Sequence, residues 1–338
     1  MVSERQQVLL FSAAHEGAQL RAAAAAMASG LFTDLLGFAP RSIVIHPSSA
    51  AATAAAECAI ALTQAEAPPT VWASELPGFV GSLDLVIVIT HDPGDHQAAR
   101  TLAAAVDRGA ATVLIGVNEG PVRFAAGADT IVVPESTLPT EGSFLLPLGY
   151  ILALLATVGA SALGSDANLR DVADLVDQEL ATCAPDRDGA SNPARQLAES
   201  LENHRVVFTW EHPALAAVAR FATDAWLRSG QVSVAAPWPE VQRAAVELNY
   251  AAPVAGDIFY DPELDGPLDL LPLRAVVLTT TAGHAETQRR VEAFSYARVL
   301  AAGDTTEVVD LLTDVAVTAA RLACAAPYSS SIFNDNKN

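Results

Sequence analysis

Lysine is almost missing from this sequence, whose single lysine is Lys337, next to last of 338 residues. Lysine side chains form Schiff bases, bind phosphate in P-loops and act as general bases. No lysine before position 337 is available for these roles, so mechanisms that depend on an internal lysine are excluded. Arginine stands in its place, and arginine does not release a proton near neutral pH.

Cysteine is also scarce, and its spacing argues against cross-links. Cys58, Cys183 and Cys324 are odd in number and far apart in the sequence. Neither a disulfide framework nor a zinc site is expected from such a pattern. We predict a protein of the reducing cytoplasm, without a metal or another cofactor.

Positive charge is lacking as well, because the formal net charge is −20. A nucleic-acid partner or an anionic membrane surface would require a basic stripe, and the sequence shows none. We therefore predict neither a nucleic-acid partner nor a membrane partner. A strongly acidic surface also keeps a protein soluble, which is the simpler consequence of this charge.

No apolar stretch has the composition of a membrane span. The best candidate, residues 144–163, contains Pro147, Gly149 and Gly159, and it indicates a buried loop and helix instead. The first residues, MVSERQQVLLFSAAHEG, include an early glutamate and a short apolar patch, unlike a signal peptide. The sequence also lacks a P-loop, a nucleophile elbow, a dinucleotide fingerprint and a zinc helix, which removes most kinase, hydrolase and dehydrogenase interpretations.

What is present is an alternation of strand and helix patterns. Residues 84–91 form an apolar run typical of a strand buried on both faces, residues 96–108 are helical, and residues 111–118 form the next buried strand. This βαβ unit predicts a parallel sheet with helices on both sides. Further predicted elements of the first lobe are a helix over 16–36, a strand over 42–46, an alanine-rich helix after the turn at 47–49, a strand over 130–133, and two helices within 144–182.

The second half repeats this plan after a linker over residues 184–194. We predict strands over 205–211, 275–280 and 295–300, and helices that begin at Asn192 and cover 212–228, 286–294 and 305–324. The fold class is therefore α/β, with two domains of flavodoxin-like three-layer plan, each a parallel sheet flanked by helices. The predicted domains are 1–183 and 184–328, followed by a polar tail, 329–338.

Ligands of open parallel sheets bind beyond the carboxyl ends of the strands, so the loops there are the candidate sites. In the first lobe these loops offer Ser48, Ser49 and Thr53 after one strand, and Thr90 and His91 after the next. Their hydroxyls suit a phosphate at a helix N-terminus. An ordinary serine N-cap is the alternative, and it is the more common use of such residues.

The loop after Thr90 carries acidic residues where a phosphate cradle would carry hydroxyls. Asp92 and Asp95 would repel a phosphate dianion by several kcal/mol, on the order of magnitude that Coulomb's law gives at short range. With His91 and His96 they could hold a metal, although the spacing matches no metal motif. The favoured interpretation is a helix N-cap at Asp95.

In the second lobe the corresponding loops hold Glu211 and His212, and then three threonines followed by a histidine. Glu211 and His212 could act as an acid and base, but surface residues before a helix are the simpler interpretation. Thr279, Thr280 and Thr281 form the most hydroxyl-rich loop of the chain, and His284 follows them.

Several stretches together resemble the sugar isomerase (SIS) domain proteins, in particular the bifunctional phosphoglucose/phosphomannose isomerases and an actinobacterial branch of them. These stretches are EGAQLRA at 16–22, DLVIVITHDPGD at 84–95, NPARQLAESL at 192–201 and FYDPELDGPL at 259–268. The resemblance implies two five-stranded parallel sheets, a homodimer, and a site between lobes and subunits. It also implies a sugar phosphate held by serines and threonines of the first lobe, while a glutamate, a histidine and a lysine move protons.

The sequence departs from that family at the positions that carry its chemistry. The family's phosphate loop, Ser-x-Ser-Gly-x-Thr-x-Glu, is THDPGDHQ at 90–97. The segment matching the catalytic glutamate is LRSGQ at 227–231, which contains Arg228. Pro239-Glu240 matches the family's Pro-Glu, but Arg243 stands where the histidine follows. No internal lysine exists.

The sequence thus predicts a phosphosugar-isomerase-like protein that binds a sugar phosphate or a related carbohydrate derivative, with a degenerate catalytic site. One alternative is an active aldose–ketose isomerase with a rebuilt site, in which Glu240, Arg243 and His284 act as catalytic residues. The predicted substrate-binding residues of the chain are Ser48, Ser49, Thr53, Thr90, His91, Arg228, Thr280 and Thr281. A second alternative is a non-catalytic structural or interaction protein.

Overall fold

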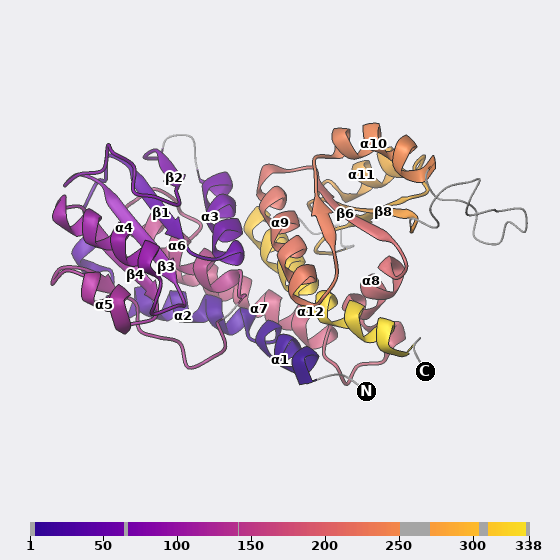
Figure 1. Cartoon of the computed structure of the whole chain (residues 1–338), viewed down its shortest axis with the longest axis horizontal. Coiled ribbons are helices and arrows are strands. Elements are labelled where there is room, and N and C mark those ends of the chain that lie inside the picture. Colours follow the sequence, from indigo (N-terminus) through magenta and orange to yellow (C-terminus); the bar gives the residue numbers. More distant parts are fainter. Residues whose placement is uncertain (1–3, 64–66, 141, 251–270, 304–309, 336–338) are drawn as a thin grey trace, which may run out of the picture.

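The computed structural model describes residues 4–63, 67–140, 142–250, 271–303 and 310–335, which form two lobes lying side by side (Figure 1). Each lobe contains a parallel sheet covered by helices, so the predicted fold class is confirmed. The family-like stretch at 259–268 lies outside the described residues.

The first sheet has five strands in the order β2-β1-β3-β4-β5. Their bounds are Ile43–Pro47 for β1, Thr70–Trp72 for β2, Leu85–Thr90 for β3, Ala111–Gly116 for β4 and Ile131–Val132 for β5. All neighbours are parallel. Every residue of β1 and β3 is buried, as expected for central strands with helices on both faces.

The helices of the first lobe surround this sheet and extend toward the second lobe. They are α1 (Glu4–Ala13), α2 (Glu16–Ala28), α3 (Ala50–Leu62), α4 (His96–Asp107), α5 (Gly120–Ala125), α6 (Leu145–Thr157) and α7 (Asp166–Thr182). One apolar cluster fills the side of α2, α3 and α6, and a second lies under α4 and α5 on the opposite face. The sheet is therefore the middle of three layers.

The second sheet has four strands within the described residues, in the order β7-β6-β8-β9, where the family resemblance implies five. The strands are β6 (Arg205–Trp210), β7 (Ser233–Ala235), β8 (Leu273–Leu278) and β9 (Ala297–Leu300), again all parallel. The helices are α8 (Pro193–Leu201), α9 (Pro213–Arg228), α10 (Trp238–Tyr250), α11 (His284–Val291) and α12 (Leu311–Asp335).

The lobes meet through helices rather than through the sheets. Helix α3 packs on α9, and α12 packs on α7, α8, α9 and α1, so the last helix of the chain crosses the boundary between the lobes (Figure 1). An ion pair links Glu57 of α3 to Arg220 of α9. Because one continuous apolar cluster includes residues of both lobes, the two are joined by a common core.

One predicted helix was too long. The helix predicted over 16–36 ends at Ala28, because Gly30 adopts a left-handed conformation with φ of 80°. The amide of Leu31 donates to Ala26 O and that of Gly30 donates to Met27 O, a Schellman motif that closes the helix before the predicted end. At the other end of the chain, α12 continues to Asp335, into the segment predicted as a polar tail.

Five elements have no counterpart in the sequence-based prediction, namely α1, β2, α5, β7 and α10. β2 and β7 are edge strands of three residues each, too short to show a strand period. Their pairing with β1 and β6 makes them strands, and that pairing is a tertiary contact.

The Tyr328 hydroxyl fixes the last helix to the end of α7 by donating to Cys183 O at 2.7 Å. Tyr328 is 4 % exposed, so the carbonyl gains no water when the hydroxyl is removed. We expect Tyr328→Phe to lower the free energy of unfolding by about 1 kcal/mol, measured by urea unfolding. An unchanged unfolding midpoint would show that this bond contributes nothing.

Candidate functional site

The strongest candidate site lies beyond the carboxyl ends of the first sheet. We call the loops that follow β1, β3, β4 and β5 the first loop cluster (residues 48–49, 91–95, 117–119 and 133–140). These loops meet because the parallel strands all end at the same edge. Among the residues predicted for the site, Ser48, Ser49, Thr90 and His91 belong to or border this cluster.

The carboxylate of Asp95 is the polar centre of the cluster. Its Oδ1 accepts from the amides of Gln97 and Ala98, each at 2.9 Å, so Asp95 is the N-cap of α4. Its Oδ2 accepts from the Thr90 hydroxyl at 3.2 Å, and the Ser48 hydroxyl donates to the same carboxylate. The N-cap predicted at Asp95 is thus present, and it also engages two hydroxyls predicted to bind substrate.

Two titratable groups respond to this arrangement. Burial raises the pKa of Asp95, but the hydrogen bonds from Ser48, Ala98, Thr90 and Gln97 outweigh burial, and the net pKa lies below the ordinary value. The carboxylate is therefore ionised at neutral pH. Burial lowers the pKa of His46, at the end of β1, more than the Ala73 carbonyl and Asp95 raise it.

A cavity of about 90 Å³ opens at the ends of β3, β4 and β5, and His91, from the loop that also carries Asp95, is part of its lining. Its polar lining comes from His91, Glu135, Ser136, Thr140 and Tyr150. The Thr140 hydroxyl and His91 Nδ1 lie 3.2 Å apart, so the last of these loops contacts the β3 loop directly.

Gly116, at the end of β4, makes this close approach of strands possible. It has φ of 120°, and a Cβ there would lie 1.8 Å from Thr90 O. Only glycine fits such a conformation and contact, so the floor of the cavity depends on the missing side chain.

Ser49 and Thr53 have local roles at the start of α3. Ser49 Oγ accepts from Ala52 N at 3.1 Å as an N-cap, and the Thr53 hydroxyl donates to Ser49 O at 2.9 Å. These contacts correspond to the capping alternative considered for this loop.

The second sheet presents a similar set of loops, which we call the second loop cluster (residues 211–212, 236–237, 279–283 and 301–303). Its centre is Asp314 of α12, which is 1 % exposed. The amide and the hydroxyl of Thr281 donate to this carboxylate, the hydroxyl at 2.5 Å. Burial raises the pKa of Asp314 above its ordinary value, although the Thr281 hydrogen bonds oppose the shift.

The remaining groups of the second cluster also contact one another. Glu211 pairs with Arg290, and His212 Nδ1 accepts from Ala214 N as the N-cap of α9. The Thr280 hydroxyl accepts from Gly283 N, which shapes the turn before His284. Glu211 and His212 therefore have separate partners and do not form an acid–base pair.

Two predicted catalytic residues, Glu240 and Arg243, lie on the helix that begins directly after the second loop cluster, and the predicted substrate-binding residue Arg228 lies at the boundary between the lobes. Glu240 and Arg243 lie on α10 and pair with each other at 2.5 Å, with side chains 55 % and 71 % exposed. Arg228, at the end of α9, pairs with Asp224 at 2.9 Å and donates to Gly142 O at 3.3 Å, at the boundary between the lobes. The described residues show no contact that joins His284 to Glu240 or to Arg243.

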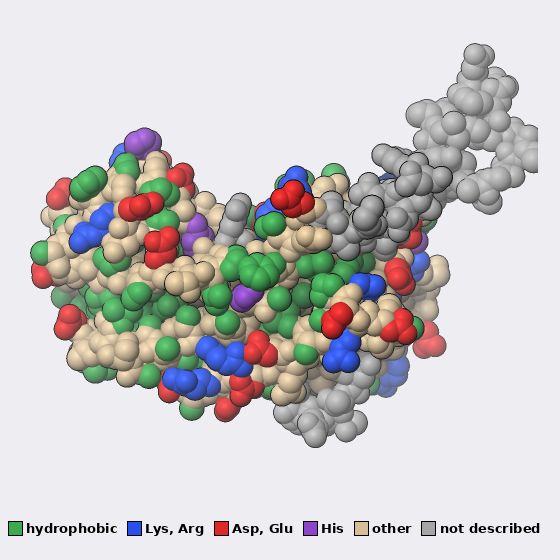
Figure 2. Space-filling view, turned by 90° about the horizontal axis from the view of Figure 1, so that it is seen from below, with side chains coloured by type: hydrophobic (Ala, Val, Ile, Leu, Met, Phe, Trp, Pro, Cys, Tyr) green, Lys and Arg blue, Asp and Glu red, His purple; other side chains and the backbone are tan. Residues whose placement is uncertain are grey.

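None of the residues of the first loop cluster is a lysine or an arginine, whereas Arg290 and Arg321 contact the second loop cluster at Glu211 and Ala301. On the face in Figure 2, arginines are scattered among acidic side chains. Within the part of the chain that the structure describes, no group of three or more His, Cys, Asp or Glu residues could hold a metal ion. The same part contains no helix long and apolar enough to cross a membrane.

Several residues of these clusters escape prediction from the sequence. Asp314 and Thr140 are each far from their partners in the chain. Asp314 lies 33 positions after Thr281, and Thr140 lies 49 positions after His91. The only hint for Asp314 is a carboxylate within an otherwise apolar helical stretch.

Comparison with known proteins gives a clear answer for the fold only. No family model matches the sequence, and no relative is found among curated proteins. Among solved structures, the tagatose-6-phosphate ketose/aldose isomerase of Escherichia coli is similar, with a TM-score of 0.63 and 13 % identity over 98 % of this chain and 93 % of that chain. The C-terminal domain of the glucosamine-fructose-6-phosphate aminotransferase of Francisella tularensis is also similar, with a TM-score of 0.64 and 11 % identity over 98 % of this chain and 97 % of that chain. The chain therefore has the two-lobed fold of phosphosugar isomerases along its whole described length.

Proposed function

We propose that this chain is a phosphosugar-isomerase-like protein that binds a sugar phosphate or a related carbohydrate derivative at the first loop cluster, without turning it over. The fold supports the ligand class, since the solved structures similar to this chain include proteins named for sugar-phosphate reactions. The cluster supports the location, because hydroxyls, a histidine and a cavity meet there.

The observation that carries the proposal is the separation of the groups that an isomerase would need together. A shift of a carbonyl between neighbouring carbons requires a base within about 3 Å of the proton it removes. Glu240 is exposed and paired with Arg243, and Arg228 is engaged by Asp224. Arginine cannot serve as the missing base.

The proposal predicts binding without turnover. Purified protein is incubated with fructose 6-phosphate, mannose 6-phosphate and glucose 6-phosphate, and with the corresponding free sugars, and product formation and thermal shift are measured. We expect at least one carbohydrate to raise the melting temperature, and no product above the uncatalysed background.

The other outcomes separate the alternatives. Turnover that disappears in Glu240→Gln or Arg243→Ala would establish the rebuilt isomerase. If no compound gives turnover or a thermal shift, the result contradicts the proposal and favours the alternative of a structural or interaction protein. We also propose a homodimer that works in the cytoplasm, and light scattering of the purified protein measures its mass.

A further inference from the structure

The donors at the beginning of α4 have the composition of an anion site. Two hydroxyls, of Ser48 and Thr90, and two amides, of Gln97 and Ala98, converge on one carboxylate. Hydroxyls and helix N-terminal amides are the groups that hold phosphate at strand–helix turns. At this turn the anion is part of the chain itself, namely Asp95.

We infer that Asp95 occupies the anion position of the first loop cluster, and that the ligand of this cluster is a polyhydroxyl compound without a phosphate at that position. This inference rests on the proposed function, and it narrows the ligand from a sugar phosphate to a carbohydrate whose end facing Asp95 is uncharged or cationic. Asp95 is then a specificity-determining residue.

The electrostatics around Asp95 agree with an uncharged ligand. The cavity of the first loop cluster, which His91 of the Asp95 loop lines, has Glu135 in its lining, and among its described lining residues there is no arginine or lysine. Asp92 lies in the same loop, where its Oδ1 accepts from Gly94 N at 2.8 Å. A phosphate dianion would meet carboxylates without a compensating cation, whereas a sugar hydroxyl can donate to them.

His46 gives a second, independent indication. It is 2 % exposed, and its Nδ1 lies 3.1 Å from Ala73 O, a carbonyl that can only accept, so Nδ1 carries the proton. Its lowered pKa keeps the ring neutral, which makes Nε2 an acceptor. Nε2 is buried without a partner among the described residues, and the ring is close enough to Asp95 for their charges to interact. A buried acceptor suits a hydroxyl donor and not a phosphate oxygen.

A matched pair of ligands tests the inference on the full-length protein. Calorimetry compares fructose with fructose 6-phosphate, and inorganic phosphate serves as a probe without a sugar. For the natural sequence we expect fructose to bind more tightly than its phosphate, and no binding of inorganic phosphate. Asp95→Ser keeps a favourable N-cap residue but removes the charge. We expect this variant to bind fructose 6-phosphate more tightly than fructose, with at least a tenfold change in the ratio of the dissociation constants of these two compounds. We also expect it to bind inorganic phosphate.

The controls separate charge at the anion position from charge in general. Asp107→Ser removes an equal charge from the exposed far end of α4, and this variant must bind all three compounds as the natural sequence does. If Asp95→Ser does not fold, Asp95→Asn keeps the cap and shape, and must show the gain in phosphate binding instead. Equal phosphate binding by the natural sequence and by a folded Asp95 variant would overturn the inference. If the natural sequence binds neither fructose nor fructose 6-phosphate, the result contradicts the proposed function alone. The inference about Asp95 is still tested in that case, because binding of inorganic phosphate by Asp95→Ser reports on the anion position.

Discussion

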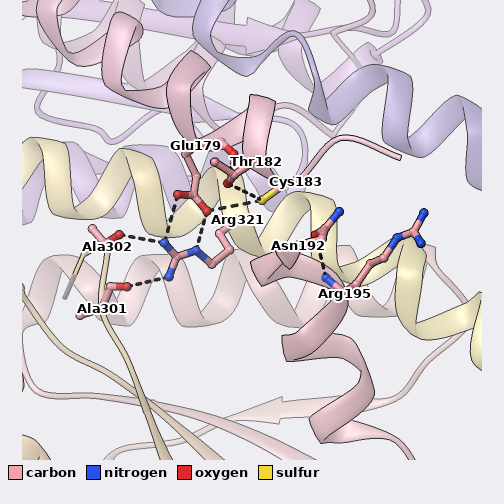
Figure 3. A network of polar contacts seen from close by, with 8 residues as sticks. All are labelled: Glu179, Thr182, Cys183, Asn192, Arg195, Ala301, Ala302 and Arg321. Atoms are coloured by element: carbon pink, nitrogen blue, oxygen red, sulfur yellow. Dashed lines mark hydrogen bonds and ion pairs between the residues drawn. The ribbon is translucent and has the colours of Figure 1, made fainter. Parts of the chain in front are cut away.

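Replacing Arg321 by alanine is expected to lower the free energy of unfolding by about 3–5 kcal/mol, the usual cost of leaving a buried charge without its partner. Arg321 of α12 pairs with Glu179 of α7 through two contacts of 2.6 and 3.1 Å, and the two side chains are only 15 % and 12 % exposed. The same guanidinium donates to the carbonyls of Ala301 and Ala302, which follow β9 (Figure 3). One side chain thus joins a helix of the first lobe to the sheet of the second.

The matched control is an exposed pair of the same chemistry. Arg170 pairs with Asp166 within α7 at 2.8 Å, with side chains 47 % and 39 % exposed. Arg170→Ala should cost no more than about 0.5 kcal/mol, because water and salt screen such pairs. Guanidinium unfolding of both variants measures the difference. A loss below about 1 kcal/mol for Arg321→Ala would show that the pair does not hold the lobes together.

A glutamine at position 16 should remove a pH dependence of stability that the natural sequence shows. Glu16 of α2 is 3 % exposed, and it accepts from Leu145 N at 2.7 Å and Phe144 N at 3.3 Å at the start of α6. Burial raises its pKa from 4.5 to about 7, although the hydrogen bonds from Leu145, Ser143 and Phe144 and the charge of Arg228 lower it.

The direction of the pH dependence of the free energy of unfolding follows from which state holds the proton on Glu16. Between pH 4.5 and about 7 the native state keeps a proton on Glu16 that the unfolded state releases. The free energy of unfolding therefore falls as pH rises through this window, by about 3 kcal/mol in total, and is constant on either side of it as far as Glu16 contributes. Glu16→Gln keeps an acceptor oxygen but cannot ionise.

The measurement is the difference in free energy of unfolding between Glu16→Gln and the natural sequence at several pH values. That difference should change in favour of the variant by about 3 kcal/mol from pH 4.5 to pH 8. Glu199→Gln, which changes an exposed carboxylate on α8, serves as a control and should show no such trend. A constant difference for Glu16→Gln would contradict the burial argument.

The two loop clusters show how far the sequence could go toward a site. Buried strands and the helix spacing between them placed Thr90 and His91 at the end of a strand, and the structure has them there. The caps at Ser49 and Asp95 follow from rules that act over three residues, so they too were within reach. The convergence of Ser48 and Thr90 on Asp95 was not, because it joins two loops whose separation depends on how β1 and β3 pair.

The predicted catalytic set illustrates the opposite limit. Glu240 and Arg243 were chosen by their alignment with a family motif, and His284 by its place after a hydroxyl-rich loop. Neither criterion carries information on side-chain direction. The structure pairs Glu240 with Arg243 on the outer face of α10, where the helix turns its apolar side, Trp238 and Val241, toward the sheet. Their part in any reaction stays a prediction.

By itself the sequence determined the two-lobed parallel architecture and the absence of an internal lysine, because apolar runs and composition are properties of the chain alone. Only the tertiary structure decided which partner each of three carboxylates has. Asp95 accepts from the hydroxyls of the first cluster, Asp314 accepts from Thr281, and Glu179 pairs with Arg321. The physical reason is range. Helix and strand patterns act between neighbours in sequence, whereas a buried charge is stabilised by whichever donors the packed fold brings within hydrogen-bond distance.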